Sequence, residues 1–169
     1  MELSSSTSTA LGILICACIL AAFVLQRRWT GAAWKRGMEA NERNDFVEMS
    51  NAFRYVVKKY PGWAMARRML ARGLAGAGQH AEAERELRFA AQLEPRNAEG
   101  HIDLAAFLLT LSRERDEEAL VCVQAALDVA PDMRAALATL PQLRALHSHP
   151  RFRDLAGLPE IEIAPARLN

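Results

Sequence analysis

The chain has 169 residues, which is enough for one domain and a membrane anchor. Its 21 basic and 20 acidic residues give a formal net charge of +1, so it has no strong basic field and no nucleic-acid partner is expected. Two of its three cysteines lie in an apolar N-terminal run, which leaves no pair for a disulfide scaffold and suits a reducing compartment.

The first element is an uncharged apolar run from Ala10 to Leu25. With three residues before it and one after, the run reaches about 20 residues and ~30 Å as a helix, which matches the hydrocarbon core of a bilayer. It therefore predicts a transmembrane helix over residues 9–27, preceded by a short non-cytoplasmic tail over residues 1–8.

The charges around this run predict its orientation. Basic residues follow the run and none precedes it, which by the positive-inside rule places the rest of the chain in the cytoplasm. The abundance of alanine and arginine suggests a bacterium, so we expect a single-pass protein of the bacterial inner membrane with its N-terminus outside. Basic and aromatic residues should mark the membrane interface, and these are Arg27, Arg28, Trp29 and Trp34.

The apolar run has other interpretations. A cleavable signal peptide would begin with basic residues, and residues 1–9 contain none. A lipoprotein would carry its lipid on Cys16 or Cys18, but the run continues seven residues past Cys18. A mitochondrial outer-membrane receptor, with an N-terminal anchor and cytosolic repeats, is a further alternative.

Three prolines recur at a nearly regular spacing in the remainder of the chain. Pro61, Pro95 and Pro131 are 34 and 36 residues apart, and each closes an apolar, helix-like stretch. Within residues 64–97, small and large residues recur at the spacing of two packed helices around a turn at Gly78: Leu70, Ala71 and Leu74, then Ala83, Leu87 and Ala90. On these residues the segment resembles one unit of the tetratricopeptide repeat (TPR) family, a helix–turn–helix of 34 residues.

The segments on either side resemble the same unit less closely. Residues 98–133 form a further TPR-like unit with a two-residue insertion in the turn at residues 112–118. Residues 28–63 comprise a juxtamembrane segment and a degenerate unit, in which Arg36 and Met49 replace the usual leucine and alanine. We expect this degenerate unit to pack loosely or against the membrane surface.

The ends of the units carry further signals. Asn97 and Asp132 follow closing prolines and are predicted to be the N-caps of the next helices. Residues 134–156 are predicted to form C-terminal capping helices, with Pro141 kinking the segment or starting a second helix. Residues 157–169 have no helical period and are expected to form an extended tail.

The resemblance implies an all-α fold, in which a single N-terminal transmembrane helix precedes a TPR-type α-solenoid of about three helix–turn–helix repeats and a capping helix. Proteins of this family usually bind their partners on the concave face made by the first helix of each unit. The corresponding positions in this chain are Trp34, Met38, Asn41, Met65, Arg68, Arg72, Ile102, Ala106 and Leu109.

Two kinds of protein partner fit these positions. Arg68 and Arg72 are one helical turn apart, so both guanidinium groups can meet an acidic segment, although they can also be part of a solvated helix face. Ile102, Ala106 and Leu109 suggest a partly apolar groove for an amphipathic helix. The carboxylate clamp of chaperone-binding TPR proteins is not matched, because apolar residues occupy its positions.

No motif indicates catalysis or a cofactor. The sequence contains no phosphate loop, nucleophile elbow or zinc-protease motif. His147 and His149 lack further ligands at matched spacing, and Cys122 is expected to pack in the core. We therefore expect a protein that is not an enzyme and that binds no metal or cofactor.

Three functions compete on these observations. The first is a membrane-anchored TPR scaffold for protein–protein interactions, which recruits or organises partners at the cytoplasmic membrane face. The second is a structural or accessory subunit of a large membrane protein complex, with other subunits as its partners. The third is an exported assembly factor for cytochrome maturation, envelope biogenesis or secretion, which requires the opposite topology.

Overall fold

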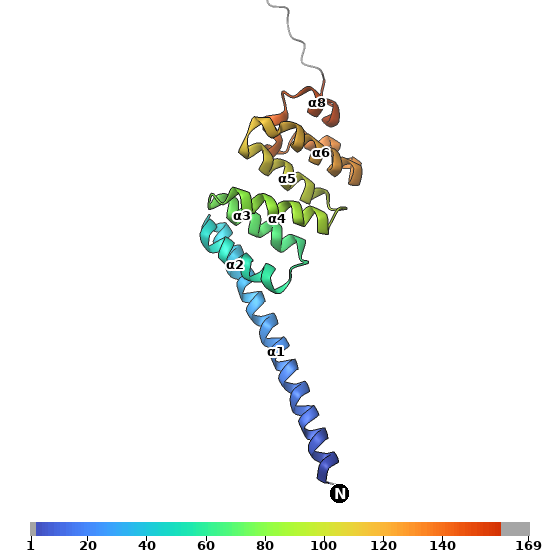
Figure 1. The fold of residues 1–169 in the computed structure, drawn as a ribbon. Helices are drawn as coiled ribbons and strands as arrows, with labels where there is room; N and C mark the ends of the chain where they lie inside the picture. The colour runs from blue at the N-terminus through green and yellow to red at the C-terminus, as the bar shows by residue number, and fades with distance from the viewer. Residues whose placement is uncertain (1–2, 160–169) are drawn as a thin grey trace, which may run out of the picture.

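The structure is a computed structural model that describes the backbone of residues 3–159 and the side chains of residues 13–22, 24–25 and 27–159. Over these residues the fold is all-α (Figure 1). The expected tail at residues 157–169 lies outside the described residues from residue 160 onward. The helices are α1 Leu3–Glu42, α2 Phe46–Lys59, α3 Ala64–Gly76, α4 His80–Leu93, α5 Ala98–Leu111, η1 Arg113–Arg115, α6 Asp116–Val129, η2 Pro131–Met133, α7 Arg134–Leu137, η3 Pro141–Leu146 and α8 Pro150–Ala156.

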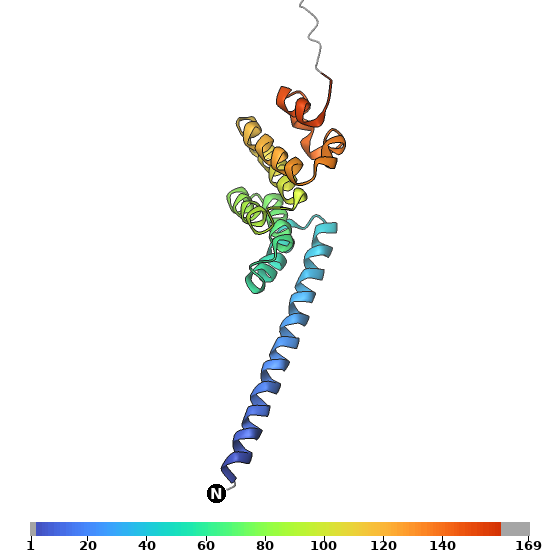
Figure 2. The same cartoon turned by 90° about the vertical axis from the view of Figure 1, so that its right-hand side faces the viewer.

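Helix α1 is one continuous helix of 40 residues, so the apolar run and the first helix of the first unit are a single rod. The sequence contains no proline between residues 3 and 42 to interrupt it. We call the part of α1 before Thr30 the stalk, because the described side chains from residue 13 to residue 29 are all exposed and burial begins at Thr30. Figures 1 and 2 show the stalk leaving the rest of the molecule, the body, as a straight helix.

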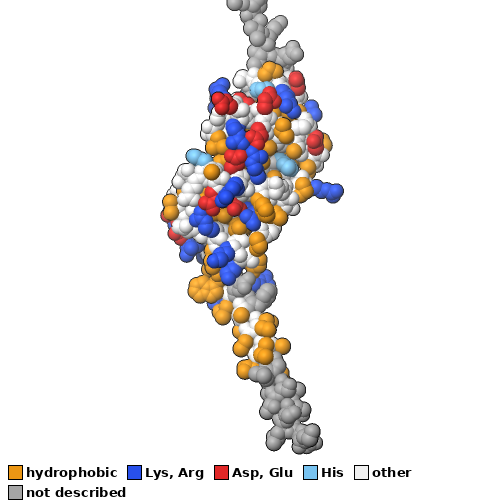
Figure 3. All heavy atoms as spheres, in the orientation of Figure 1, with side chains coloured by type: hydrophobic (Ala, Val, Ile, Leu, Met, Phe, Trp, Pro, Cys, Tyr) orange, Lys and Arg blue, Asp and Glu red, His pale blue; other side chains and the backbone are white. Residues whose placement is uncertain are grey.

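The stalk is apolar on its surface. Ile13, Leu20 and Trp29 are each about two-thirds exposed or more, and Figure 3 shows hydrophobic side chains along the stalk and charges of both signs on the body. Among the described residues, α1 is the one helix that is long and apolar enough to cross a membrane.

The body consists of helical hairpins that stack along one direction. Helix α1 packs on α2, α3 on α4 and α5 on α6, while α2–α3 and α4–α5 contacts join successive hairpins. The buried side chains form one hydrophobic cluster that runs through the three hairpins and the C-terminal segments. This arrangement is a TPR-type α-solenoid, as the sequence predicts.

Local signals explain where several helices begin. Asn44 takes a left-handed conformation with φ of 56°, and the Asp45 carboxylate then accepts a hydrogen bond from the Glu48 N–H at 3.0 Å. Asn97 caps α5 by accepting from the Gly100 N–H at 3.2 Å, which confirms its predicted role. The prediction for Asp132 is wrong, because this residue lies inside the short helix η2.

The first hairpin packs as closely as the others, in contrast to the loose packing that the sequence suggested. Met49 and Phe53 are fully buried, and the Phe53 ring lies so close to Gly37 that a Cβ there would approach it within 2.6 Å. Gly73 of α3 allows the backbone of Ser50 to approach in the same way, at 2.7 Å from such a Cβ. Small residues therefore set the spacing of α1, α2 and α3.

The two-residue insertion builds a charged network that joins α4 to α6. It forms η1, from which Arg115 contacts Glu84 of α4 at 2.8 Å and Glu118 of α6 at 2.5 Å. Arg88 of α4 contacts both carboxylates as well, at 2.7 Å to Glu84. Hydrogen bonds from Arg115 and then Arg88 lower the pKa of Glu84 to about 2.

The C-terminal cap is made of short segments and not of long helices. Pro141 starts a second helix, but this helix is the 3₁₀ segment η3, which packs on α5, while α8 packs on α6. Leu137, Leu143 and Phe152 are fully buried, so the cap closes the hydrophobic core despite its irregular backbone.

The network predicts a pH-dependent contribution of Glu84 to stability. We expect Glu84→Gln to lower the free energy of unfolding by about 1 kcal/mol at pH 7, because the network is partly exposed. The pKa of Glu84 is lower in the folded protein than its ordinary value of 4.5, so its contribution is complete above about pH 4.5 and is lost as the pH falls towards 2.

The measurement is urea unfolding followed by circular dichroism at several pH values in detergent. Glu114→Gln is the control, because Glu114 is exposed and has no ion pair among the described residues. A difference between wild type and Glu84→Gln that stays constant from pH 7 to the acid limit would contradict this assignment.

Candidate binding groove

The helix arrangement creates a groove of about 590 Å³ between α3 and α5. Leu87 of α4 and Gln142 of the cap also line it. We call this the groove, and its lining residues are Arg68, Met69, Ala71, Arg72, Ala75, Leu87, Asp103, Ala106, Phe107, Thr110 and Gln142. It lies on the first helices of the second and third units, where TPR-type proteins are expected to bind.

Arg68 forms ion pairs within the protein. Its side chain is 9% exposed, and its Nε donates to Asp103 Oδ2 at 2.6 Å while an Nη donates to Glu99 Oε2 at 3.2 Å. Burial opposes the charge, yet the bonds to the two carboxylates leave the pKa of Arg68 raised. Arg68 therefore joins α3 to α5 and does not present a free cation, which corrects the expectation that it meets an acidic partner.

Arg72 differs from Arg68 in its surroundings. Its side chain is exposed, it lines the groove one turn from Arg68, and it has no ion pair among the described residues. Its guanidinium group can donate to a carboxylate without first breaking an internal bond. The groove thus combines one available cation with an apolar floor of alanines, Met69, Leu87 and Phe107.

The other predicted groove residues on α3 and α5 differ in burial and in whether they line the groove. Ala106 lines the groove, and Leu109 lies half-buried on the same helix. The prediction for Ile102 is corrected: it is 3% exposed and belongs to the buried cluster that also contains the cap leucines. Met65 is 39% exposed but does not line the groove.

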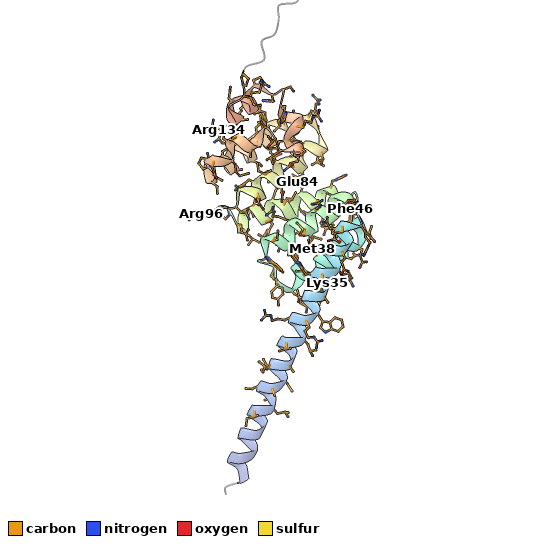
Figure 4. The ribbon with its side chains drawn as sticks, turned by 180° about the vertical axis from the view of Figure 1, so that it is seen from behind. Lys35, Met38, Phe46, Glu84, Arg96 and Arg134 are labelled. Carbon is orange, nitrogen blue, oxygen red and sulfur yellow. The ribbon has the colours of Figure 1, made fainter. Side chains whose placement is uncertain are left out.

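The three predicted residues of the first unit lie on α1, away from this groove. Trp34 stacks on Trp63, with ring centroids 4.5 Å apart and planes 12° apart. Met38, which Figure 4 labels on α1, packs against the core. Asn41 is half-buried near the C-terminus of α1. The first unit therefore adds no side chain to the groove between α3 and α5.

Sequence reasoning missed eight of the eleven residues that line the groove, which are Met69, Ala71, Ala75, Leu87, Asp103, Phe107, Thr110 and Gln142. Asp103 is one position after Ile102 in the third unit, and its 35-residue separation from Arg68 is close to the repeat period, which was a usable signal. Phe107 and Thr110 lie on the same face of α5 as Asp103, because Phe107 follows Asp103 by four residues and Thr110 follows Phe107 by three. Gln142 carries no sequence signal, because it belongs to the irregular cap.

Other features of the described residues add no second site. A more open hollow of about 680 Å³ is lined only by residues 94–99 of one turn, so it is a surface depression. No group of three or more histidine, cysteine or acidic side chains in the described part of the chain could hold a metal. Cys122 is buried among core residues, and burial raises the pKa of its thiol.

Comparisons with known proteins identify the fold. The chain is similar to a mutant O-GlcNAc transferase of Thermobaculum terrenum, with a TM-score of 0.59 and 23% identity over 73% of this chain and 23% of the transferase. It is also similar to the TPR2B domain of yeast Sti1, solved as a complex with pHsp70, with a TM-score of 0.55 and 18% identity over 77% of this chain and 97% of the domain.

These similarities show a TPR-type helical repeat fold. No protein-family model matches the sequence, and no curated protein matches it. The alignment to the transferase spans less than a quarter of that enzyme's chain, so its activity is not carried over.

Asp103→Ala is expected to lower the free energy of unfolding by about 1–3 kcal/mol, because it leaves the buried guanidinium group of Arg68 without its closest partner. Glu99→Gln should change it by less than about 0.5 kcal/mol, since Glu99 is the more exposed and more distant partner. Urea unfolding in detergent measures both. Equal effects of the two substitutions would show that Arg68 is not anchored on Asp103.

Proposed function

We propose that this protein is a membrane-anchored scaffold that recruits or organises partner proteins at the cytoplasmic face of the bacterial inner membrane. It acts by binding and not by catalysis. The groove between α3 and α5 is the binding surface, and α1 is the anchor. The observation that carries the proposal is the unpaired Arg72 above an apolar groove floor, in a protein of TPR-type fold.

The anchor rests on the surface of the stalk. The described side chains between residues 13 and 25 are all exposed, and the large ones among them are hydrophobic. Exposing such a surface to water is unfavourable by about 25 cal/mol for each Å² of apolar area, whereas a bilayer accommodates it. The basic residues that follow, Arg27 and Arg28, favour the cytoplasmic placement of the body.

The chemistry of the groove indicates the kind of partner. Met69, Ala106 and Phe107 offer an apolar surface, and Arg72 offers a donor pair beside it. Asp103 is already neutralised by Arg68, so it does not repel an acidic segment. A partner segment that fits is amphipathic, with apolar side chains against the floor and a carboxylate opposite Arg72.

The TPR2B domain of Sti1 supports a protein as the partner, because it was solved as a complex with pHsp70. That domain and this chain share the fold at 18% identity, so the precedent concerns the kind of ligand and not its identity.

Substitutions in the groove test the proposal. Arg72→Glu should reduce the recovery of the co-purifying protein about tenfold, which is the effect of losing one charge-assisted hydrogen bond. Ala106→Glu should reduce the recovery of the same protein to a similar extent, because it places a carboxylate where the partner's apolar side chains would pack. The measurement is mild detergent extraction from native membranes, followed by affinity purification and quantitative mass spectrometry. Arg85→Glu is the matched control, because Arg85 is exposed on α4 and does not line the groove.

A set of proteins that is unchanged by both groove substitutions would reject the groove as the binding surface. A stoichiometric set of membrane proteins that also survives both substitutions would favour the alternative of a structural subunit, held through other surfaces.

Reporter fusions at the C-terminus test the orientation. We expect a fused green fluorescent protein to fluoresce and a fused alkaline phosphatase to remain inactive, because Arg27 and Arg28 should retain the body in the cytoplasm. Release of the fusion from membranes by carbonate would reject the anchor. An active phosphatase would instead favour the exported assembly factor.

A further inference from the structure

The body has a face that is turned towards the stalk. Helix α2 runs antiparallel to α1 and ends at Lys59, and the following loop returns to α1, where Trp63 stacks on Trp34 at 4.5 Å. In Figure 1 this connection between α2 and α3 is the part of the body nearest the stalk. We call Lys58, Lys59, Tyr60 and Trp63 the underside.

The underside lies close to the level where a bilayer would end. The apolar run ends at Leu25, and the body covers α1 from Thr30, which is 4% exposed. Five residues of helix rise only about 7.5 Å, and the nine residues from Leu25 to Trp34, on which Trp63 stacks, rise about 13.5 Å. Each headgroup layer of a bilayer is roughly 5–8 Å thick, so the body begins at the outer edge of the headgroups.

The balance of basic and acidic residues also changes along the chain, from the part near the stalk to the part far from it. Residues 27–81 contain eleven basic and four acidic residues, whereas residues 82–159 contain nine basic and thirteen acidic ones. The segment between Glu48 and Glu82 has no acidic residue. The half of the protein nearest the stalk is therefore basic, and the distant half is acidic.

The positive charges of the underside are available. On α1, Lys35 pairs with Glu39 at 3.7 Å and Arg36 with Glu48 at 2.8 Å. Lys58 and Lys59, by contrast, are exposed and have no ion pair among the described residues. Lys59 lies 5.9 Å from the centre of the Tyr55 ring, which leaves its ammonium group at the surface.

Aromatic side chains accompany these lysines. Trp63 is 39% exposed despite its stack on Trp34, and Trp29 on the stalk is 66% exposed. Tryptophan and tyrosine prefer the membrane–water interface, where the ring is apolar and the N–H or O–H group is hydrated. Lysines with neighbouring aromatic rings just beyond the headgroup layer, within a Debye length of about 8–10 Å, match an anionic lipid surface.

We propose that the underside binds anionic phospholipid headgroups of the membrane that α1 crosses. This inference rests on the proposed function, because it requires α1 to be inserted. The contact gives the body a second attachment beside α1. Each exposed lysine at this height contributes about a five-fold factor in affinity for an anionic surface, within a Debye length of about 8–10 Å.

The chain offers a direct probe, because its only lysines are Lys35, Lys58 and Lys59. The full chain is reconstituted in nanodiscs of phosphatidylcholine alone or with 30% phosphatidylglycerol, and amine labelling is followed by mass spectrometry. We expect Lys58 and Lys59 to react about five-fold more slowly on the anionic discs at low salt. Lys35, which pairs with Glu39 on α1, is the internal reference and should change less.

A second measurement distinguishes contact between the underside and the lipid from a general effect of surface charge on amine labelling. Hydrogen exchange of residues 60–65 should be slower on anionic than on neutral discs for the wild type, and this protection should be lost in Lys58→Gln/Lys59→Gln. Arg113→Gln/Arg134→Gln removes the same charge far from the stalk, where Figure 4 labels Arg134, and should retain the protection.

The outcomes distinguish this inference from the function on which it rests. A chain that is not retained in either kind of disc rejects the anchor and the lipid contact together. A chain that is retained, but whose lysines react equally on both discs, rejects the lipid contact alone. Protection that persists without the two lysines also rejects it. Slower labelling that reverts in 0.5 M salt supports it.

Discussion

The continuity of α1 is the constraint on which the rest of the structure depends. One helix provides both the exposed apolar stalk and the first helix of the first hairpin, so every later helix is placed relative to the rod. Gly37 lets Phe53 approach α1, and Gly73 lets α3 approach α2. Because these contacts involve fully buried side chains and backbone, the body is held on α1 by close packing and not by a flexible linker.

The charged residues divide into those that hold the solenoid together and those that remain available. Arg68 and Arg115 each bridge neighbouring units, the first across the groove and the second on the α4–α6 side. Arg72 and the lysines of the underside have no such partners among the described residues. The protein thus uses similar side chains for two purposes, and the number of carboxylates within reach decides which purpose each one serves.

Much of the fold could be predicted from the sequence, because the 34-residue period and the pattern of small and large residues record the packing of each hairpin directly. The candidate groove could be predicted only in part. Arg68 and Arg72 look alike in sequence, and only the position of Asp103 on the next unit separates them. Ile102 follows the groove pattern but is buried in the core. Gln142 lines the groove from the cap, whose short 3₁₀ segments have no periodic signal. The continuity of α1 was not predicted from the sequence, because its first half indicates a membrane span and its second half indicates the first helix of a repeat unit.

Because α1 is one helix without a hinge, it also fixes the rotation of the body around the helix axis relative to the apolar run. Thr30, where the body begins, follows the end of the apolar run by a set number of residues, and each residue of an α-helix turns its direction by about 100° and raises it by ~1.5 Å. The direction in which the groove faces around the axis of α1, relative to the apolar run, is therefore set by the length of α1 between Leu25 and Thr30. In an assembly of several proteins, that length decides which neighbour the groove faces.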